Sequence, residues 1–313
     1  MKKLFASILA VLLATVHCMN AHAGEKTTNH NVRSESAIVF LVAGQSNAGG
    51  VAVFSLETNI KAGMQDKAPV NPGTTAKEVG IPTTKDAYPH SYIWKPKAGP
   101  FERLTPEKNL QACYLDPWRH GIELPMAMLL EKKYPDCKIY FIKHGPAGHN
   151  LHTQWKAGKG PDYGNFLAQY RGAMSDIRKC HDKVQVVGLY WDQGEADHYQ
   201  KQVKSYGKNL REFFEALRKD TGIPELQIYV RELGLFERDA DYKTIADAQI
   251  KLCRKDANAH LLKLDLGGSG EENKKAWGWS TNNWHLSSKA YLELSKRIMK
   301  LSETTDHILY LVP

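Results

Sequence analysis

The sequence has few cysteines and lacks the motifs that commonly hold a metal ion or an organic cofactor. Five Cys occur among 313 residues, and no Cys-x-x-Cys pair or Cys/His group has the spacing of a zinc site. A phosphate-binding loop, a Gly-x-Gly-x-x-Gly stretch after a strand and a His-Glu-x-x-His helix are also missing. The "GGSG" at residues 267–270 lacks a following helix signal and is typical of a loop. These absences predict a protein that uses neither a metal ion nor a cofactor.

Sequence patterns of nucleic-acid binding are absent as well. The formal net charge is +8, but the chain contains no arginine-rich helix, no zinc-finger spacing and no aromatic ribonucleoprotein motif. The basic residues are spread along the chain, which favours a role of the charge in solubility. Attraction to an acidic polysaccharide is the open alternative. We therefore predict no nucleic-acid partner.

Long apolar runs are confined to the first 23 residues. "MKK" gives a basic start, "LFASILAVLLATV" is short for a membrane span, and "AHA" at residues 21–23 is a small-x-small cleavage site. We predict a signal peptide over residues 1–23, a secreted or periplasmic mature protein, and no membrane association after cleavage. An uncleaved anchor and a lipoprotein attached through Cys18 are the alternatives. The leader carries Lys2, Lys3 and no acid, so cleavage lowers the charge of +8 by two, to +6.

Four cysteines remain after the predicted cleavage. They are Cys113, Cys137, Cys180 and Cys253. An oxidising compartment permits disulfides, and four cysteines allow three pairings, among which the sequence does not choose. Buried free thiols are the alternative. The sequence does not indicate an oligomeric state either.

Residues 24–34 are polar and without pattern, and we predict a mobile lead-in followed by one domain over residues 35–313. From residue 37 to 302, apolar β-rich runs alternate with helical patterns, and residues 55–118 are predicted to form a long surface excursion, with a short strand possible at "SYIWKP". The predicted strands are 37–44, 137–145, 184–192, 226–233 and 259–268, and the predicted helices are 122–134, 165–180, 206–222, 242–256 and 287–302. This alternation predicts an α/β fold, a three-layer α/β/α sandwich with a mainly parallel five-stranded sheet.

Ligands bind at the carboxyl ends of the strands in an open parallel sheet. The first three predicted strands end in "GQSN", "HGPAGHNL" and "WDQGEAD", and the fifth is followed by "GWSTNNWHLS". Ser46 stands between a strand and a predicted helix, where backbone amides and the helix dipole favour negative charge. This position suits a nucleophile whose tetrahedral intermediate carries an oxyanion. For an isolated serine, a helix N-cap would be the simpler interpretation.

Five motifs in order give the chain a family resemblance. They are "GQSNAGG", "HGIELPMAMLLE", "AGHNLHTQW", "WDQGEAD" and "NNWHLSSKAYLELSKRI", and the likeness that they carry extends over roughly residues 36–302. In this order they resemble the SGNH-hydrolase superfamily, and within it the sialate O-acetylesterase and acetyl-xylan-esterase-like group, carbohydrate esterase family six. The resemblance implies an SGNH or flavodoxin-like sheet and a serine esterase that acts on acetylated oligo- or polysaccharides.

The resemblance also assigns roles to single residues. Ser46 would be the nucleophile and His285 the base that takes its proton. The oxyanion hole would consist of the backbone amides of Ser46 and Gly148 and the side-chain amide of Gln193. For Glu195 and Asp197 of the "WDQGEAD" motif, we predict that they brace the loop by hydrogen bonds, and a reactive role is the alternative.

One position departs from the family pattern. The usual Asp-x-x-His motif reads "NNWH" here, so Asn282 stands where an aspartate would orient the imidazole of His285. An amide can hold the ring but does not stabilise the imidazolium by charge. Three alternatives follow: a dyad oriented by Asn282, another carboxylate in the place of the acid, or a pocket that only binds. The candidate carboxylates are Asp192, Asp265, Glu271 and Glu272.

Together these features predict a secreted serine esterase that removes O-acetyl groups from carbohydrates through an acetyl-enzyme on Ser46. Acetyl transfer to another sugar hydroxyl through the same intermediate is one alternative, and a glycan-binding protein on a degenerate hydrolase fold is another. Long apolar lid helices are absent from the sequence, which argues against a lipid substrate. Six tryptophans are candidates for a sugar platform or for the core: Trp118, Trp155, Trp191, Trp277, Trp279 and Trp284.

Overall fold

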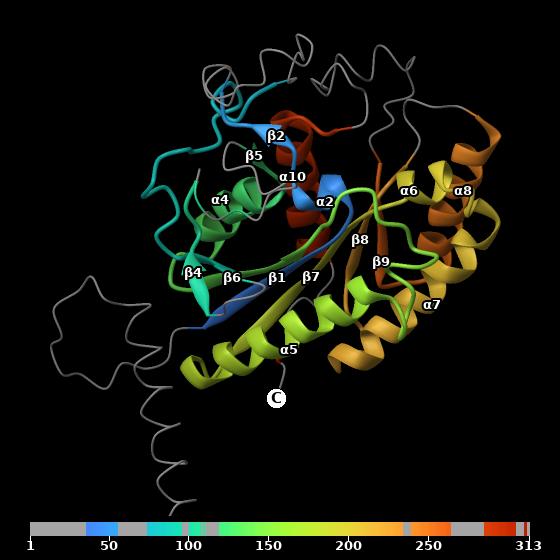
Figure 1. Ribbon diagram of the computed structural model, residues 1–313. Coiled ribbons are helices and arrows are strands. Elements are labelled where there is room, and N and C mark those ends of the chain that lie inside the picture. Colours follow the sequence, from blue (N-terminus) through green and yellow to red (C-terminus); the bar gives the residue numbers. More distant parts are fainter. Residues whose placement is uncertain are drawn as a thin grey trace, which may run out of the picture.

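The computed structural model describes residues 36–55, 74–95, 100–106, 108, 110, 119–233, 239–263, 285–304 and 310–311. In this part of the chain, one sheet lies between two groups of helices, which gives the three layers that the sequence predicts (Figure 1). The predicted signal peptide and lead-in, residues 1–34, lie outside the described residues. So do Asn282, Asp265, Glu271, Glu272 and four of the tryptophans, Trp118, Trp277, Trp279 and Trp284.

The central sheet contains more strands than the five that the sequence predicts. Its hydrogen-bonded order is β4–β3–β6–β1–β7–β8–β9, a path of seven strands, and β10 joins it beside β7. The strands are β1 (Ala37–Gly44), β3 (Ser91–Trp94), β4 (Phe101–Arg103), β6 (Lys138–His144), β7 (Val184–Asp192), β8 (Ile228–Arg231), β9 (Ala259–Leu262) and β10 (Tyr310–Leu311). All neighbours from β3 to β9 pair in parallel, and β4 and β10 are antiparallel. A separate antiparallel pair consists of β2 (Ala52–Val53) and β5 (Arg119–His120).

The extra edge strands come from the segment that its composition predicts to be a surface excursion. Residues 91–94 of β3 are buried, and three of them pair in parallel with β6. A run of only four residues among Pro, Lys and Gly carries almost no pattern. Its strand conformation depends on the β6 edge beside it, because strand preference is set mainly by packing against neighbours.

Five long helices cover the two faces of the sheet. α4 (Glu123–Lys133) and α10 (Ser288–Thr304) share one apolar core with one face, and α5 (Pro161–Cys180), α7 (Val203–Thr221) and α8 (Ala240–Lys255) share another with the opposite face. β1 supplies both cores: its odd residues from Ala37 to Ala43 face one, and Ile38, Phe40 and Val42 face the other. Because side chains alternate along a strand, burial on both faces requires the continuous apolar run seen in the sequence.

The helix boundaries follow local signals in the sequence. The Ser287 hydroxyl accepts the N–H of Ala290 at 3.2 Å and caps α10. The Asp239 carboxylate accepts the N–H of Tyr242 at 2.7 Å and caps α8. α7 ends at Gly222, whose φ of 72° lies in the left-handed region that glycine adopts without a steric penalty.

Two of the tryptophans that the structure describes are fully buried in the core. Trp155 and Trp191 are both 0% exposed and lie edge to face, with ring centroids 5.3 Å apart. Neither can form a sugar platform, because a platform needs an exposed ring face. Of the two alternatives for these residues, sugar platform or core, the structure confirms the core.

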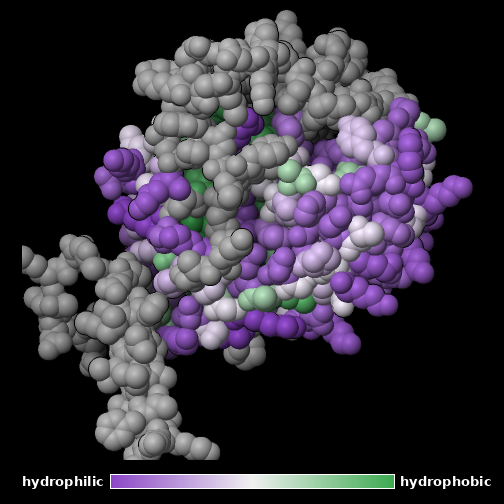
Figure 2. Space-filling model, viewed as in Figure 1, coloured by the Kyte–Doolittle hydropathy of each residue, from purple (hydrophilic) through white to green (hydrophobic). Residues whose placement is uncertain are grey.

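The described surface is mainly hydrophilic. The face over α5 and α7 in Figure 2 shows mostly polar and charged side chains, and among the described residues Tyr199 is the exposed large hydrophobic residue. Within the same residues, no helix is both long and apolar enough to cross a bilayer. Cys180 is disulfide-bonded, and burial raises the pKa of the Cys253 thiol to about 12.

Candidate functional site

The carboxyl ends of β1, β6 and β7 meet at one edge of the sheet. Ala43 of β1 pairs with His144 of β6, and Gly44 pairs with Asp192 of β7. β6 lies on one side of β1 and β7 on the other, and the order of the strands reverses at β1. Such a switch point is where open α/β sheets bind ligands, and three of the predicted site motifs follow these strand ends.

A close backbone crossing presents Ser46 at this edge. Gly44 has a φ of +144°, and a Cβ atom there would lie 2.0 Å from the carbonyl oxygen of Asp192, so only glycine fits. The N–H of Gln45 donates to the same carbonyl at 2.8 Å. The short helix α2 (Ser46–Gly49) begins directly afterwards, and the Ser46 side chain lies at its first residue with 7% of its surface exposed.

His285 contacts Ser46 although 239 residues separate them. Its Nε2 lies 3.2 Å from the Oγ of Ser46, within hydrogen-bond distance. The pKa of His285 is lowered to about 4, mainly by burial; the charge of Arg119 also lowers it, Asp192 raises it, and Arg231 lowers it. The ring is therefore neutral at neutral pH, which is the state in which it can accept the serine proton.

This lowered pKa leads to an expected pH profile. For a neutral-base mechanism, kcat/KM on p-nitrophenyl acetate should stay level as the pH falls from 7 to about 5. It should then decline through a pKa near 4, because only the neutral imidazole accepts a proton. The rate measurement would be paired with circular dichroism at each pH to exclude unfolding. An acid limb near 6.5, the ordinary value for histidine, would contradict the burial of the base.

Asn47 links three of the motifs, a role that the sequence analysis missed. Its side chain is 0% exposed. Its Oδ1 accepts the N–H of Leu286 at 3.0 Å, next to the base, and its Nδ2 lies 3.4 Å from the Oε1 of Glu195. The hydroxyl of Tyr291 donates to its carbonyl oxygen at 2.7 Å. The residue after Ser46 thus holds the segment of His285 in register with α2.

The segment between β6 and α5 brings Gly148 to the same edge. A Cβ atom on Gly145 would lie 2.2 Å from the backbone nitrogen of Gly49, so this segment packs directly on α2. Gly148 is exposed and has a φ of +67°, and its carbonyl accepts the side-chain amide of Gln200 at 3.1 Å. Its carbonyl is thereby fixed by a neighbouring side chain, on an exposed stretch beside α2.

The "WDQGEAD" loop is tied together by its own side chains. Gln193 is 0% exposed, and its Nε2 donates to the Oδ2 of Asp197 at 2.6 Å and lies 3.4 Å from the carbonyl of His149. Asp197 also accepts the N–H of Leu151 at 2.7 Å. Asp197 therefore connects this loop to the segment that carries Gly148. The Gln193 amide has two hydrogens, and in this structure they face the Asp197 carboxylate and the His149 carbonyl.

A buried ionic cluster lies beneath the loop. The Arg231 guanidinium donates to the Oδ1 of Asp192 through Nε at 2.9 Å and through Nη2 at 2.5 Å, and Nη2 also contacts the Oε1 of Glu195. The hydroxyl of Tyr190 donates to the Oδ2 of Asp192 at 2.5 Å. Both oxygens of Asp192 are thus engaged by Arg231 and Tyr190, so this candidate for the orienting acid serves the ionic cluster and acts on His285 through its charge.

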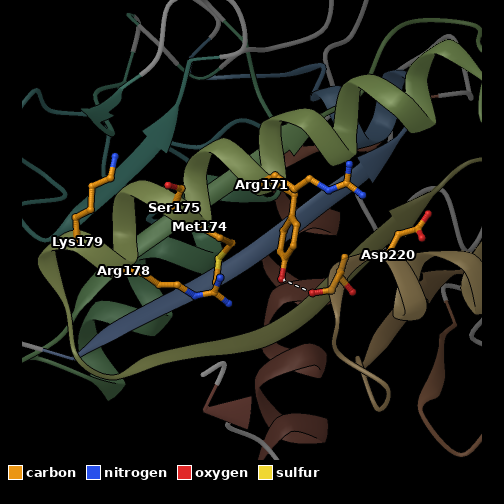
Figure 3. A pocket seen from close by; sticks show the side chains of 8 residues that line it. Arg171, Met174, Ser175, Arg178, Lys179 and Asp220 are labelled. Atoms are coloured by element: carbon orange, nitrogen blue, oxygen red, sulfur yellow. Dashed lines mark hydrogen bonds between the residues drawn. The ribbon is translucent and has the colours of Figure 1, made fainter. Parts of the chain in front are cut away.

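A surface pocket elsewhere on the molecule is separate from this edge. It has a volume of about 490 Å³ and lies between the C-terminal halves of α5 and α7, where Arg171, Arg178 and Lys179 line it opposite Asp220 (Figure 3). Each helix is followed in the chain by a parallel strand, α5 by β7 and α7 by β8, so its C-terminal end and the pocket lie toward the amino ends of the strands. Ser46 lies at their carboxyl ends, and the pocket is not part of the candidate site.

With the edge of the sheet defined, the sequence family can be stated. Residues 36–303 match the family described as carbohydrate esterase, sialic acid-specific acetylesterase. The chain belongs to this family. It is a carboxylic ester hydrolase of the carbohydrate-acetylesterase type, as its motifs predict. Among curated proteins, none matches the chain significantly.

Solved structures support the fold of this carbohydrate esterase. NanS superimposes with a TM-score of 0.58 at 13% identity, over 87% of this chain and 99% of that one. A protein from Arabidopsis thaliana gives a TM-score of 0.56 at 17% identity, over 84% and 98%. A carbohydrate acetylesterase from Xanthomonas citri gives 0.50 at 14% identity, over 88% of this chain and 57% of that one. At these identities the likeness establishes a shared fold.

The esterase site therefore combines predicted and unpredicted residues. The structure brings Ser46, His285, Gly148 and Gln193 to one edge, with Glu195 and Asp197 beside them, whereas Asn282 lies outside the described residues. Asn47 and Arg231 were not singled out by their sequence context. A signal existed for Asn47, which directly follows the serine in "GQSN", and for Arg231, a charged residue inside the apolar run "LQIYVREL".

Proposed function

We propose that the protein is a secreted serine esterase that removes O-acetyl groups from a carbohydrate of the acetyl-xylan or sialate type through an acetyl-enzyme on Ser46. The observation that carries the proposal is the 3.2 Å contact between the Nε2 of His285 and the Oγ of Ser46. A neutral imidazole against a serine hydroxyl at a switch point is the arrangement of a base and its nucleophile. Membership of a carbohydrate esterase family supports turnover over binding alone.

Acylation begins when His285 accepts the proton of Ser46. The Oγ attacks the acetyl carbonyl carbon, and the negative charge that develops on the carbonyl oxygen is stabilised by the amides of Ser46, Gly148 and Gln193. Removal of one such donor typically costs ~3 kcal/mol in the activation barrier. The intermediate collapses as the protonated His285 gives its proton to the sugar oxygen, which leaves as a hydroxyl. The product on the enzyme is an acetyl ester of Ser46.

Deacylation repeats these steps with water. His285 takes a proton from the water that attacks the acetyl carbonyl, and returns it to Oγ when the second intermediate collapses to acetate. If a sugar hydroxyl replaced the water, the same intermediate would give acetyl transfer. Secretion is supported by the leader-like residues 1–23 and by the disulfide-bonded Cys180, since disulfides persist in oxidising compartments.

The proposal is tested by acetate release from a panel of acetylated glycans. Acetylated xylan and O-acetylated sialosides should release acetate with the wild-type protein and not with Ser46→Ala. A mass-spectrometric search for newly acetylated sugars in the same reactions distinguishes transfer from hydrolysis. If wild-type protein releases no acetate from any member of the panel or from p-nitrophenyl acetate, the esterase proposal is wrong.

A further inference from the structure

Two histidines bracket the segment that carries Gly148, and both contact one carboxylate. The sequence reads His144-Gly-Pro-Ala-Gly-His149, with His144 as the last residue of β6. The Nε2 of His144 lies 2.9 Å from the Oδ1 of Asp162, and the Nδ1 of His149 lies 2.6 Å from its Oδ2. Each oxygen of Asp162 therefore holds one end of the segment. The family assignment gives no role to these three residues.

Asp162 is itself held rigidly. It lies in the first turn of α5 with 4% of its surface exposed, and its N–H donates to the carbonyl of Gln154 at 2.9 Å. Burial raises the pKa of its carboxyl, but the interactions with His144 and His149 lower it by more, so the group is anionic. A negative charge in the first turn is also favoured by the dipole of this long helix.

The contacts define the protonation of both rings. An ionised carboxylate only accepts, so the two ring nitrogens that face Asp162 each carry a proton. The Nε2 of Gln169 lies 3.3 Å from the other nitrogen of His144, which fits an unprotonated Nδ1 that accepts from the amide. No group of three or more His, Cys, Asp or Glu side chains in the described part of the chain is placed to hold a metal ion. Asp162, His144 and His149 are thus joined by hydrogen bonds alone, and we call these three residues the clamp.

The clamped segment lies directly against the site. Gly145 packs on the backbone of Gly49 in α2, and the carbonyl of His149 lies 3.4 Å from the Nε2 of Gln193. The segment is four residues long between the two histidines, so a shift at either end moves Gly148 relative to Ser46. Catalysis is sensitive to such shifts, because a misplacement of 1 Å can lower a rate ~10²-fold.

We propose that Asp162 is a positioning residue of the esterase: through His144 and His149 it holds the segment from Gly145 to Gly148 so that the Gly148 amide faces the developing oxyanion. The inference rests on the proposed function. Asp162 contacts no reacting atom and acts only through the two histidines. Its effect belongs to the transition state, since the oxyanion is stronger as an acceptor than the carbonyl of the bound ester.

The test is the kinetics of Asp162→Asn. The substitution keeps the shape of the side chain but replaces one acceptor oxygen by an NH₂ group, so one histidine loses its partner. We expect kcat on p-nitrophenyl acetate to fall about 10- to 100-fold with KM changed less than about threefold. Asp220→Asn is the matched control: Asp220 accepts the hydroxyl of Tyr163, the residue next to Asp162, at 2.6 Å and does not touch the segment. Its kcat should equal that of wild type.

Amide hydrogen exchange of residues 145–149 gives a second readout that does not need turnover. Exchange should rise in Asp162→Asn and stay unchanged in Asp220→Asn. If Asp162→Asn does not fold, His149→Ala replaces it, because that ring is 39% exposed, and it should show the same loss of kcat and the same rise in exchange. Wild-type kcat, a loss confined to KM, or unchanged exchange would overturn the positioning role. A wild-type protein without esterase turnover overturns the proposed function instead, and exchange then decides separately whether Asp162 holds the segment.

Discussion

Ser46→Ala is expected to lower kcat on acetyl esters by at least about 10³-fold while the melting temperature stays close to that of wild type. In the proposed mechanism the hydroxyl forms the acetyl-enzyme, so its removal eliminates the covalent route and leaves only binding and oxyanion stabilisation. His285→Ala should cost a similar factor, and the double variant little more, because the two groups act as a unit. The measurements are initial rates on p-nitrophenyl acetate and thermal denaturation.

The control for this experiment is Ser175→Ala. Ser175 is an exposed serine on α5 at the pocket drawn in Figure 3, far from the carboxyl edge of the sheet. Its substitution removes the same atoms without touching the site and should leave kcat unchanged. A well-folded Ser46→Ala protein with full activity would show that Ser46 is not the nucleophile.

Arg231→Met should produce the largest loss of stability. Arg231 is 4% exposed and lies between Asp192 and Glu195, which are 0% and 5% exposed. Without it, two buried carboxylates face each other unpaired, and removal of one partner from a buried ion pair typically costs about 3–5 kcal/mol. Burial raises the pKa of Asp192 and Arg231 opposes this, so the variant should take up a proton there. The free energy of unfolding is measured by urea denaturation.

The matched control is Arg211→Met on α7. Its guanidinium lies 3.9 Å from the carboxylate of Glu215, and their side chains are 58% and 68% exposed. Exposed pairs contribute about 0–1 kcal/mol, so this variant should unfold at nearly the wild-type urea concentration. Esterase activity should fall only in Arg231→Met, because its cluster supports Asn47 and the loop of Gln193. An Arg231→Met protein as stable as wild type would refute the role of the cluster.

The parallel core of the fold could be predicted from the sequence, because its helices are long and its main strands are apolar on both faces. β1, β6 and β7 are continuous apolar runs, and helices such as α7 repeat apolar residues on one face before a terminal glycine. For β3 the sequence indicated only a possible short strand at "SYIWKP", and β4 was not predicted, since three or four residues carry no usable period. Their conformation comes from pairing with a sheet that other segments build.

The candidate site likewise contains residues that the sequence predicted and residues that it did not. Ser46 and His285 were predicted because each stands in a motif with a family pattern. The order of such motifs can be recognised in the sequence without knowing any distance in space. The clamp on the Gly148 segment was not predicted, because Asp162 lies 13 residues beyond His149 and shares no motif with it. Nothing in the sequence "GPDYGNF" distinguishes this aspartate from an ordinary first-turn acid of a helix.

The sequence alone determined the class of the sheet, the positions of its main strands along the chain, the nucleophile and base candidates and the esterase family, because these depend on local periodicity and on motifs in one order. Only the tertiary structure decided that the Nε2 of His285 reaches Ser46, that Asn47 and Arg231 connect the motifs, and that one carboxylate holds both ends of the Gly148 segment. These contacts join residues from different strand ends. Their distances are set by how the parallel strands align at one edge, and no local pattern encodes that alignment.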